Sequence, residues 1–524
     1  MKTRLVHNWL VAALIVAALS AGSCDREITV GPSRQAGRTA QIQPDYCDTV
    51  IPPNIAPLNF LIREPGSQYY VKIHSEQGDP VEIAGRSPKI RIPPAPWRKL
   101  LETNRGKTLH TEVCVKTEDG RWMRFDPISC QIAAEEIDPF LYYREIRPIH
   151  NRWSDMCIWQ RHIESFNKSP IVHNRSFKRG CVHCHSFLHH DSDNMFIHCR
   201  TSNGPAMVLI QDGQATSIDS RTQFGSAPMG HSAWHPDGNI IAFTVYKVRQ
   251  FFHTAQMEVR EGMDVESALG YYLVDSRETR TAPALSQANR LETFPAWSPD
   301  GRWLYFCSAP VWWTEHGKPP ERYDEIKYDL VRVSYNPKAD AWGQVETVLS
   351  ARETGQSIAQ PRFSPDGRFL LFCMLDHGCF PTFRDSSDLY LMNTETGVYR
   401  RLSCNSERPE SWHCWSSNGR WIAFSSKRKA VLFSRVYFSY IDREGKSYKP
   451  FVLPQEDPTF DDSYMRLYQL PELADGPLPI RGEKLARLVR SPSLRPDALP
   501  MTGATPKAAT PSEYTDIQDQ ATQH

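Results

Sequence analysis

The chain has 524 residues, 40% of them apolar and 11% aromatic, which is enough to bury more than one hydrophobic core. Its 61 Lys and Arg residues against 60 Asp and Glu residues leave a net charge of +1, which argues against the basic footprint of a nucleic-acid-binding protein. The 40 prolines and 28 glycines are typical of a turn-rich β protein.

The first residues have the layout of an export signal. Two basic residues precede an apolar run over 10–19, and small residues follow it up to Cys24, so the signal is expected to cover 1–23. The run is too short to span a membrane comfortably. Its end resembles the lipobox of bacterial lipoproteins, in which the cysteine is acylated, although Ala21 stands where that box usually has leucine. We expect a lipid anchor at Cys24; the alternative is a soluble secreted form.

Three segments follow before the first cysteine pair. Residues 24–45 are polar and aperiodic, which predicts a tether. Runs of strand-forming residues with an Asp-Gly hairpin signal predict a small β-sandwich over 46–135. Apolar residues at helical spacing within 151–174 predict a helix, so 136–180 is expected to be a helical linker.

A turn pattern recurs four times between residues 234 and 419. An aromatic residue, a polar residue, Pro, Asp and Gly are followed each time by an apolar strand, and a fourth, weaker copy has Ser and Asn in place of Pro and Asp. The copies begin at Trp234, Trp297, Phe363 and Trp415. Such a unit cannot bury its own faces, whereas stacked neighbours can, which indicates propeller blades.

These turns resemble the TolB-like (PD40) propeller family, over roughly 187–454. The resemblance implies a mainly β chain with a propeller of five to six blades over 181–456, preceded by the small β-sandwich. Residues 457–490 are expected to be a C-terminal extension. The Pro, Ala and Thr composition of 491–524 predicts a disordered tail.

A C-x-x-C-H motif opens the propeller. In c-type cytochromes two such thiols add to the haem vinyl groups and the next histidine ligates the iron. Cys181, Cys184 and His185 are therefore expected to hold haem c, with His185 as the proximal iron ligand. The alternatives are a redox disulfide or half of a zinc site, but the second cysteine pair that zinc normally needs is missing from the sequence.

The distal iron ligand is expected to be Met195 or His198. Aligning the repeats puts Phe187 at the aromatic turn position, and His198 replaces a phenylalanine that the other four copies share. Burying histidine in place of an aromatic ring needs a polar partner. Strand alternation places Met195 and His198 on opposite faces, so one iron cannot receive both from a regular strand.

Two classes of function remain open. The motif together with the repeats looks like a group of bacterial envelope proteins that join haem attachment to a propeller. In the first class, an envelope-anchored haem protein transfers electrons to an unidentified redox partner, or senses a small molecule. In the second, the propeller binds a glycan, peptide or protein and any haem or metal is structural. No hydrolase elbow is present, so we do not expect a peptidase.

The location expected from the signal and the anchor is the cell envelope, on the outer membrane, at its periplasmic face or at the cell surface. Export implies an oxidising compartment, in which disulfides form. Of the 13 cysteines, Cys114 with Cys130 and Cys404 with Cys414 are the pairs close enough along the chain to be disulfide candidates.

Overall fold

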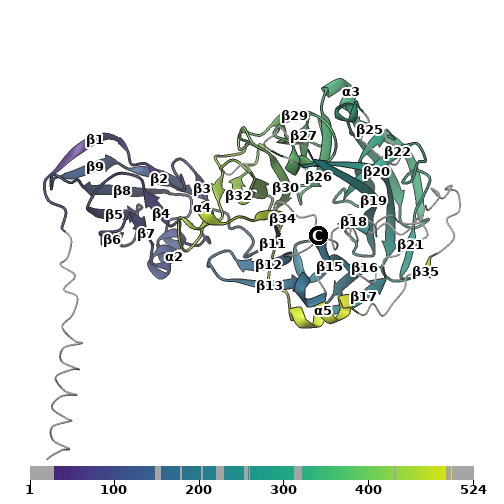
Figure 1. Ribbon diagram of the computed structural model, residues 1–524, viewed down its shortest axis with the longest axis horizontal. Coiled ribbons are helices and arrows are strands. Elements are labelled where there is room, and N and C mark those ends of the chain that lie inside the picture. The colour runs from purple at the N-terminus through teal and green to yellow at the C-terminus, as the bar shows by residue number, and fades with distance from the viewer. Residues whose placement is uncertain are drawn as a thin grey trace, which may run out of the picture.

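The computed structural model describes residues 29–147, 155–177, 180–201, 204–219, 229–252, 258, 260–311, 321–429, 432–490 and 497–498. The chain is mainly β, with an N-terminal domain beside a ring of blades (Figure 1). The signal over 1–23, Cys24 and all of the tail except 497–498 lie outside the described residues.

Two sheets and one helix form the N-terminal domain. The seven-stranded sheet comprises β1 (Ser33–Thr39), β3 (Val50–Ile51), β5 (Gln68–His74), β6 (Val81–Gly85), β8 (Thr108–Lys116), β9 (Trp122–Asp126) and β10 (Ile128–Ile132). The three-stranded sheet comprises β2 (Ile42–Gln43), β4 (Phe60–Ile62) and β7 (Lys89–Ile90). Helix α2 (Pro94–Thr103) buries Trp97, Leu100 and Leu101, which share one face of the helix.

The small β-sandwich is thus present, but the prediction of a bare tether up to residue 45 was wrong. Strand β1 pairs in parallel with β9, and β2 pairs with β4. Arg38 of β1 also forms a bidentate ion pair with Glu64, with nitrogen–oxygen distances of 2.6 and 2.7 Å. No residue of β1 is buried, so this polar strand is held by its backbone pairing with β9 and by the ion pair rather than by burial of an apolar face.

Six blades form the propeller, each with four antiparallel strands. Blade 1 contains β11 (Phe140–Ile146), β12 (Cys157–His162), β13 (Lys168–His173) and β34 (Leu467–Ala474). Blade 2 contains β14 (Cys181–Leu188), β15 (Asp191–Thr201), β16 (Gly204–Gln211) and β17 (Gln214–Asp219). Blade 3 contains β18 (Met229–Trp234), β19 (Ile240–Phe252), β20 (Arg260–Leu273) and β21 (Glu278–Arg280), with β35 (Asp497–Ala498) on its edge.

The other three blades follow in chain order. Blade 4 contains β22 (Arg290–Trp297), β23 (Trp303–Pro310), β24 (Asp329–Asn336) and β25 (Ala341–Leu349). Blade 5 contains β26 (Ser357–Phe363), β27 (Phe369–Leu375), β28 (Asp388–Asn393) and β29 (Tyr399–Arg401). Blade 6 contains β30 (Glu410–Trp415), β31 (Trp421–Ser426), β32 (Arg435–Tyr440) and β33 (Phe451–Val452). Short helices occupy the connections: α3 (Ala351–Thr354), α4 (Phe460–Ser463), α5 (Gly482–Arg490), η1 (Asn174–Phe177), η2 (Tyr323–Glu325) and η3 (Pro381–Phe383).

Blade 1 closes the ring with strands from both ends of the propeller sequence. Strand β34 lies innermost and pairs antiparallel with β11 (Figure 1). The prediction of a helical linker over 136–180 was wrong, because Cys157 and Ile158 belong to a strand whose two faces are both covered, which gives apolar runs without alternation. The segment 457–490 is likewise not a mere extension, since it supplies the inner strand of blade 1.

The repeated turn has the same geometry in blades 4, 5 and 6. In blade 4, the Ser298 hydroxyl donates to Asp300 Oδ1 at 2.6 Å and accepts from the Trp303 amide at 3.0 Å. Gly301 has φ +69°, a left-handed conformation that favours glycine. Blades 5 and 6 repeat both hydrogen bonds. The recurring sequence pattern therefore reflects one hydrogen-bonded turn that joins the two inner strands of a blade.

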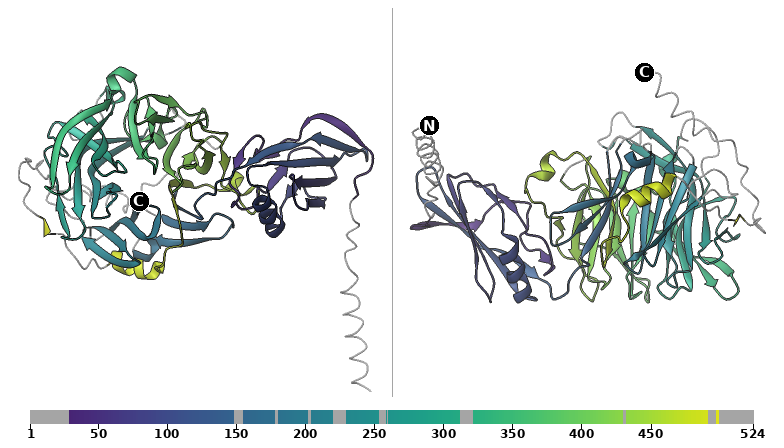
Figure 2. Two further views of the ribbon diagram at one scale, coloured as in Figure 1. Left: turned by 180° about the vertical axis from the view of Figure 1, so that it is seen from behind. Right: turned by 90° about the horizontal axis from the view of Figure 1, so that it is seen from below.

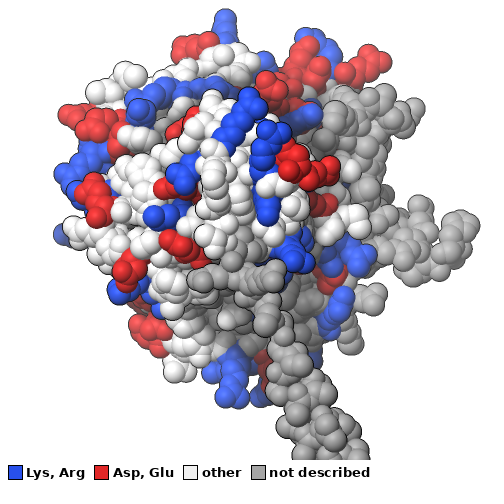
Figure 3. Space-filling view, turned by 90° about the vertical axis from the view of Figure 1, so that its left-hand side faces the viewer, with Lys and Arg blue, Asp and Glu red and all other residues white. Residues whose placement is uncertain are grey.

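One hydrophobic core joins the two domains. It runs from N-terminal residues such as Trp97 and Val113 to Trp421 and Phe438 of blade 6. The Ser417 amide also donates to Asp138 Oδ2 at 2.8 Å. Both views of Figure 2 show the N-terminal domain against the side of the ring. The face shown in Figure 3 carries basic and acidic side chains interspersed, in keeping with the small net charge.

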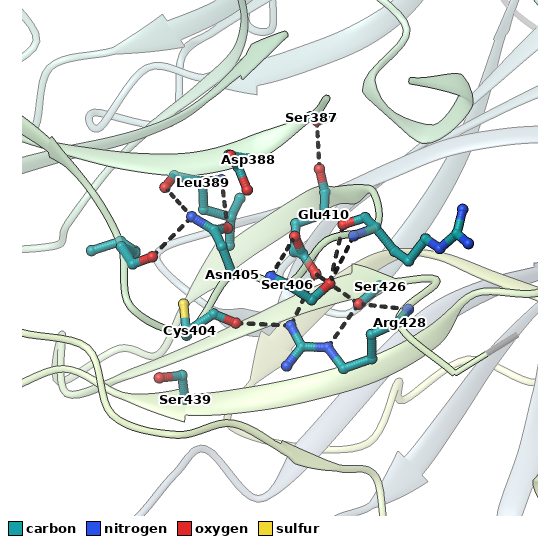
Figure 4. Close-up of polar contacts among 12 residues, drawn as sticks. Ser387, Asp388, Leu389, Cys404, Asn405, Ser406, Glu410, Ser426, Arg428 and Ser439 are labelled. Carbon is teal, nitrogen blue, oxygen red and sulfur yellow. Dashed lines mark hydrogen bonds and ion pairs between the residues drawn. The ribbon is translucent and has the colours of Figure 1, made fainter. Parts of the chain in front are cut away.

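Glu410 organises a buried polar network beside blades 5 and 6 (Figure 4). Its fully buried carboxylate accepts from the hydroxyls of Ser406 at 2.7 Å and Ser426 at 2.9 Å, and from the guanidinium of Arg428 at 3.0 Å. Its backbone carbonyl accepts from the Ser387 hydroxyl at 2.7 Å. Burial raises the pKa of Glu410, and the nearby Arg428 opposes that rise.

All cysteines in the described part of the chain are free thiols, so the two suggested disulfides are not formed. Cys130 of β10 lies opposite Leu109, five residues along β8 from Cys114, a distance of roughly 16 Å at the usual rise per strand residue. Cys404 and Cys414 are separately buried. Among the described helices, none has the length and apolar character needed to cross a membrane.

Candidate functional site

The C-x-x-C-H motif lies on β14, the innermost strand of blade 2, next to the propeller axis. Cys181, Cys184 and His185 are 4%, 3% and 2% exposed. Cys184 and His185 form part of the wall of a cavity at the axis. Cys184 and His185 therefore face the centre of the ring, whereas Cys181 packs in the apolar cluster toward blade 1.

The innermost strands of all six blades contribute to this axial cavity. Its volume is about 40 Å³, and its walls are Cys184, His185, His231, Ser232, Phe294, Pro295, Gln360, Pro361, Arg362, Trp412, His413, Leu470, Pro471 and Glu472. In five blades a residue of the inner strand adopts positive φ at the same bulge: His231, Phe294, Gln360, Trp412 and Leu470. His183 takes that position in blade 2, with negative φ. Left-handed non-glycine residues are unfavourable and tend to cluster at functional sites, which singles out the axis.

His185 is a neutral imidazole with no hydrogen-bond partner among the described residues. Both ring nitrogens are buried and unpartnered. Burial, together with the smaller effect of the guanidinium groups of Arg144 and Arg362, lowers the pKa of His185 to about 3. Neutral imidazole with a free nitrogen lone pair is the form that ligates metals.

The two thiols of the motif are protonated and shielded in the folded chain. Burial raises the pKa of Cys181, and it raises the pKa of Cys184 to about 11. The Cys184 sulfur lies 2.5 Å from His183 Nδ1 and accepts from the His231 amide at 3.4 Å. Since the thiolate is the reactive form, these cysteines are unreactive once the ring has closed.

The two candidate distal ligands lie on opposite faces of blade 2, as strand alternation predicts. Met195 packs in the apolar cluster toward blade 1, whereas the neighbouring Phe196 packs in the cluster toward blade 3. His198 follows Phe196 at a spacing of two, and its ring centroid is 5.5 Å from that of His183. Ile197, which pairs with His185, is on the Met195 face. The structure therefore brings neither candidate to the opposite side of the His185 ring.

The alignment of the first repeat was off by one residue. In blade 4, Trp297 pairs with Leu304, and the position matching Leu304 in blade 2 is Phe196, which pairs with Ser186. Ser186, not Phe187, therefore holds the aromatic position, because the β14–β15 pairing has an additional irregularity at its turn. The placement of His198 on the shared phenylalanine position is correct.

Sequence reasoning missed a histidine cluster between blades 2 and 3. His183 has ring centroids 5.5 Å from His198 and 5.7 Å from His231, and His183 Nε2 is hydrogen-bonded to the Tyr246 hydroxyl. Both nitrogens of His198 are buried and unpartnered in the described structure. One feature could have predicted this cluster: His183 and His231 occupy equivalent bulge positions of adjacent blades.

The side chains of the motif have the chemistry that covalent haem attachment requires, but the axial cavity beside them is too small for a haem. Two neighbouring thiols and an unpartnered neutral imidazole are the donors that haem c requires. A cavity of about 40 Å³ is far smaller than a porphyrin. A haem on Cys181 and Cys184 therefore requires wider spacing of the inner strands, and its attachment has to precede burial of the thiols. In the described part of the chain, no three His, Cys, Asp or Glu residues form a direct metal site.

A second cavity, larger than the axial one, lies between Gln43 of the N-terminal domain, blade 6 and residues 458–465. Its volume is about 290 Å³. None of the predicted site residues lines it.

Comparisons with known proteins give low similarity throughout. No family model and no curated protein matches the chain. It is similar to a prolyl endopeptidase structure at 17% identity, over 53% of this chain and 36% of that one, with a TM-score of 0.34. It is also similar to an oligogalacturonate lyase from Vibrio parahaemolyticus (12% identity, 73% and 100% covered, TM-score 0.33) and to the Dos1 propeller (11%, 53% and 66%, TM-score 0.31). The chain thus spans about a third of the prolyl endopeptidase, and none of these similarities bears on its activity.

Proposed function

We propose that this protein is a c-type haem protein of the cell envelope, in which Cys181 and Cys184 tether the haem and His185 ligates its iron. The observation that carries the proposal is the His185 ring, a buried neutral imidazole without a partner in the described structure, one position after Cys184 at the wall of the axial cavity. A haem bound there would supply one-electron chemistry or a site for a small molecule.

The arrangement favours small-molecule chemistry or sensing over simple electron transfer. Neither Met195 nor His198 faces the His185 ring, so neither expected distal ligand would complete the coordination of an iron held by His185. The inner strands exclude bulk solvent from His185 and keep it unprotonated. We place the protein on a membrane surface through a lipid on Cys24, in keeping with the export-signal layout.

A pyridine haemochrome spectrum of the exported full chain, produced with haem-maturation machinery, tests the proposal. The natural chain should give a c-type band that survives acid–acetone extraction, and the Cys181→Ser/Cys184→Ser variant should lose it. Cys307→Ser is the matched control, because Cys307 is also a fully buried thiol of a blade strand, and it should keep the band.

Two results would contradict the proposal. One is a colourless natural chain that is otherwise folded. The other is an extraction-resistant band that the double variant retains. Either result would leave the propeller as a binding scaffold without haem chemistry.

A further inference from the structure

The cavity between the N-terminal domain and blade 6 has the size and the position of a small-molecule site. Its volume of about 290 Å³ lies at the lower end of the roughly 300–1,000 Å³ that is typical of such sites. Small molecules are often bound where two domains meet. The residues on its walls therefore indicate which kind of molecule it takes.

Part of the wall is apolar surface that the fold leaves uncovered. Phe433, Tyr437 and Tyr464 line the cavity with aromatic rings, and Met465 adds a thioether chain. Met465 is 68% exposed, and Phe433 packs in none of the hydrophobic core clusters of the described structure. A ligand with an apolar body would cover this surface, which is favourable.

The two carboxylates on the wall already have partners. Arg435 is 5% exposed, and its Nε donates to Asp461 Oδ1 at 2.7 Å. The other guanidinium nitrogens of Arg435 donate to the backbone carbonyls of 434, 461, 464 and 466. Asp462 Oδ1 accepts from Gln43 Nε2 at 2.6 Å, and Asp462 Oδ2 lies 3.9 Å from an Arg63 nitrogen. A cationic ligand would therefore have to compete for carboxylates that are already in use.

Lys429 is the charged residue on the wall whose ammonium forms no ion pair or hydrogen bond in the described structure. The charges that act on it are paired elsewhere. Asp45 lies 2.8 Å from the Lys449 ammonium, Arg428 lies 3.0 Å from Glu410, and the two aspartates of the wall are engaged as described above. Lys429 keeps contact with solvent, yet partial burial lowers its pKa. The cavity therefore has one uncompensated positive charge, which favours a ligand with one negative charge.

The Tyr437 hydroxyl is a second free donor on this wall. It forms no hydrogen bond in the described structure, and it is not among the unpartnered polar atoms that are fully enclosed there, so it remains accessible. Burial raises the pKa of Tyr437, so the hydroxyl keeps its proton at neutral pH. A carboxylate has one charge and accepts hydrogen bonds from both an ammonium and a hydroxyl.

We infer that this cavity binds a small organic monocarboxylate, whose carboxylate pairs with the Lys429 ammonium and accepts from the Tyr437 hydroxyl, and whose apolar body covers Phe433 and Met465. None of these residues belongs to the haem motif. The inference therefore goes beyond the proposed haem function and does not depend on it.

Calorimetric titration of the full-length chain with three probes of nearly equal shape tests the site. The probes are 2-naphthoate, its neutral amide 2-naphthamide, and the cation 2-naphthylmethylammonium. One 2-naphthoate per chain should bind saturably, at least about tenfold more tightly than either of the other two, because only the carboxylate compensates the charge of Lys429.

Two substitutions assign the binding to its donors. Lys429→Met removes the charge but keeps an unbranched chain, and should weaken 2-naphthoate binding about tenfold or more while leaving 2-naphthamide binding unchanged. Tyr437→Phe removes the hydroxyl and keeps the ring, and should weaken 2-naphthoate binding about fivefold. Lys484→Met, at an exposed position of α5, is the matched control and should bind as the natural chain does.

The inference is overturned if 2-naphthoate does not bind, if the amide or the ammonium probe binds equally well, or if folded Lys429→Met protein keeps the natural affinity for 2-naphthoate. Lys429 is exposed, so its substitution should leave the fold intact even if Tyr437→Phe does not. A chain that binds 2-naphthoate but never acquires haem would contradict only the proposed function.

Discussion

Asp264 should make the protein less stable as the pH rises toward neutrality. The residue lies in β20, is 5% exposed, and faces the Cys379 sulfur at 3.4 Å and the Tyr328 hydroxyl at 3.5 Å. Burial raises its pKa to about 7, against an ordinary value of 3.8, and the two hydrogen bonds only partly oppose this. The folded state therefore keeps a proton that the unfolded state releases above about pH 4.

The size of the effect follows from the pKa difference. A shift of about 3 units corresponds to about 4 kcal/mol, since one unit is worth about 1.4 kcal/mol. The stabilisation is complete below about pH 4 and is lost as the pH rises to about 7. Asp264→Asn has no proton to hold, and its side-chain oxygen can accept from the same two donors.

Urea unfolding of both chains, followed by tryptophan fluorescence between pH 4.5 and 8 at constant ionic strength, measures the effect. The unfolding free energy of Asp264→Asn relative to the natural chain should rise by roughly 3–4 kcal/mol over this range. A difference that is flat within about 0.5 kcal/mol, or that falls with pH, would refute the reasoning.

One further substitution and one truncation test other parts of the fold. Glu410→Ala should lower the unfolding free energy in urea by about 3–5 kcal/mol, because it leaves the Arg428 guanidinium without its buried counter-charge, while exposed Glu395→Ala should change it by less than about 0.5 kcal/mol. A chain ending at Pro458 lacks β34 and should show a larger radius of gyration in X-ray scattering and a lower thermal midpoint than a chain ending at Arg490. Equal midpoints for the two truncated chains would mean that β34 does not close the ring.

Blades 3 to 6 could be predicted because each has, between its two inner strands, a turn that requires particular residues. Ser298, Asp300 and Gly301 of blade 4 each have a local role in that turn, so the pattern is visible without knowledge of the fold. Blade 1 has no such turn, and its inner strand is about 300 residues from its other strands in the sequence. No sequence pattern within either segment predicts that the strands at 140–146 and 467–474 pair with each other.

The candidate site was predictable in its chemistry but not in its surroundings. The spacing of Cys181, Cys184 and His185 indicates the donors directly. The left-handed backbone of Gln360 and Trp412 could not be predicted, because it depends on a bulge that appears only when the inner strands pair. A glutamine and a tryptophan in two β-strands carry no signal of their own.

The pairing of β34 with β11 also sets an order of events during synthesis. About 280 residues separate the end of β14 from the start of β34. At 5–20 residues per second, a ribosome needs roughly 15–60 s to make that stretch. For that interval the nascent chain cannot seal its own centre, so an enzyme that modifies β14 has a window that closes when the last strand arrives.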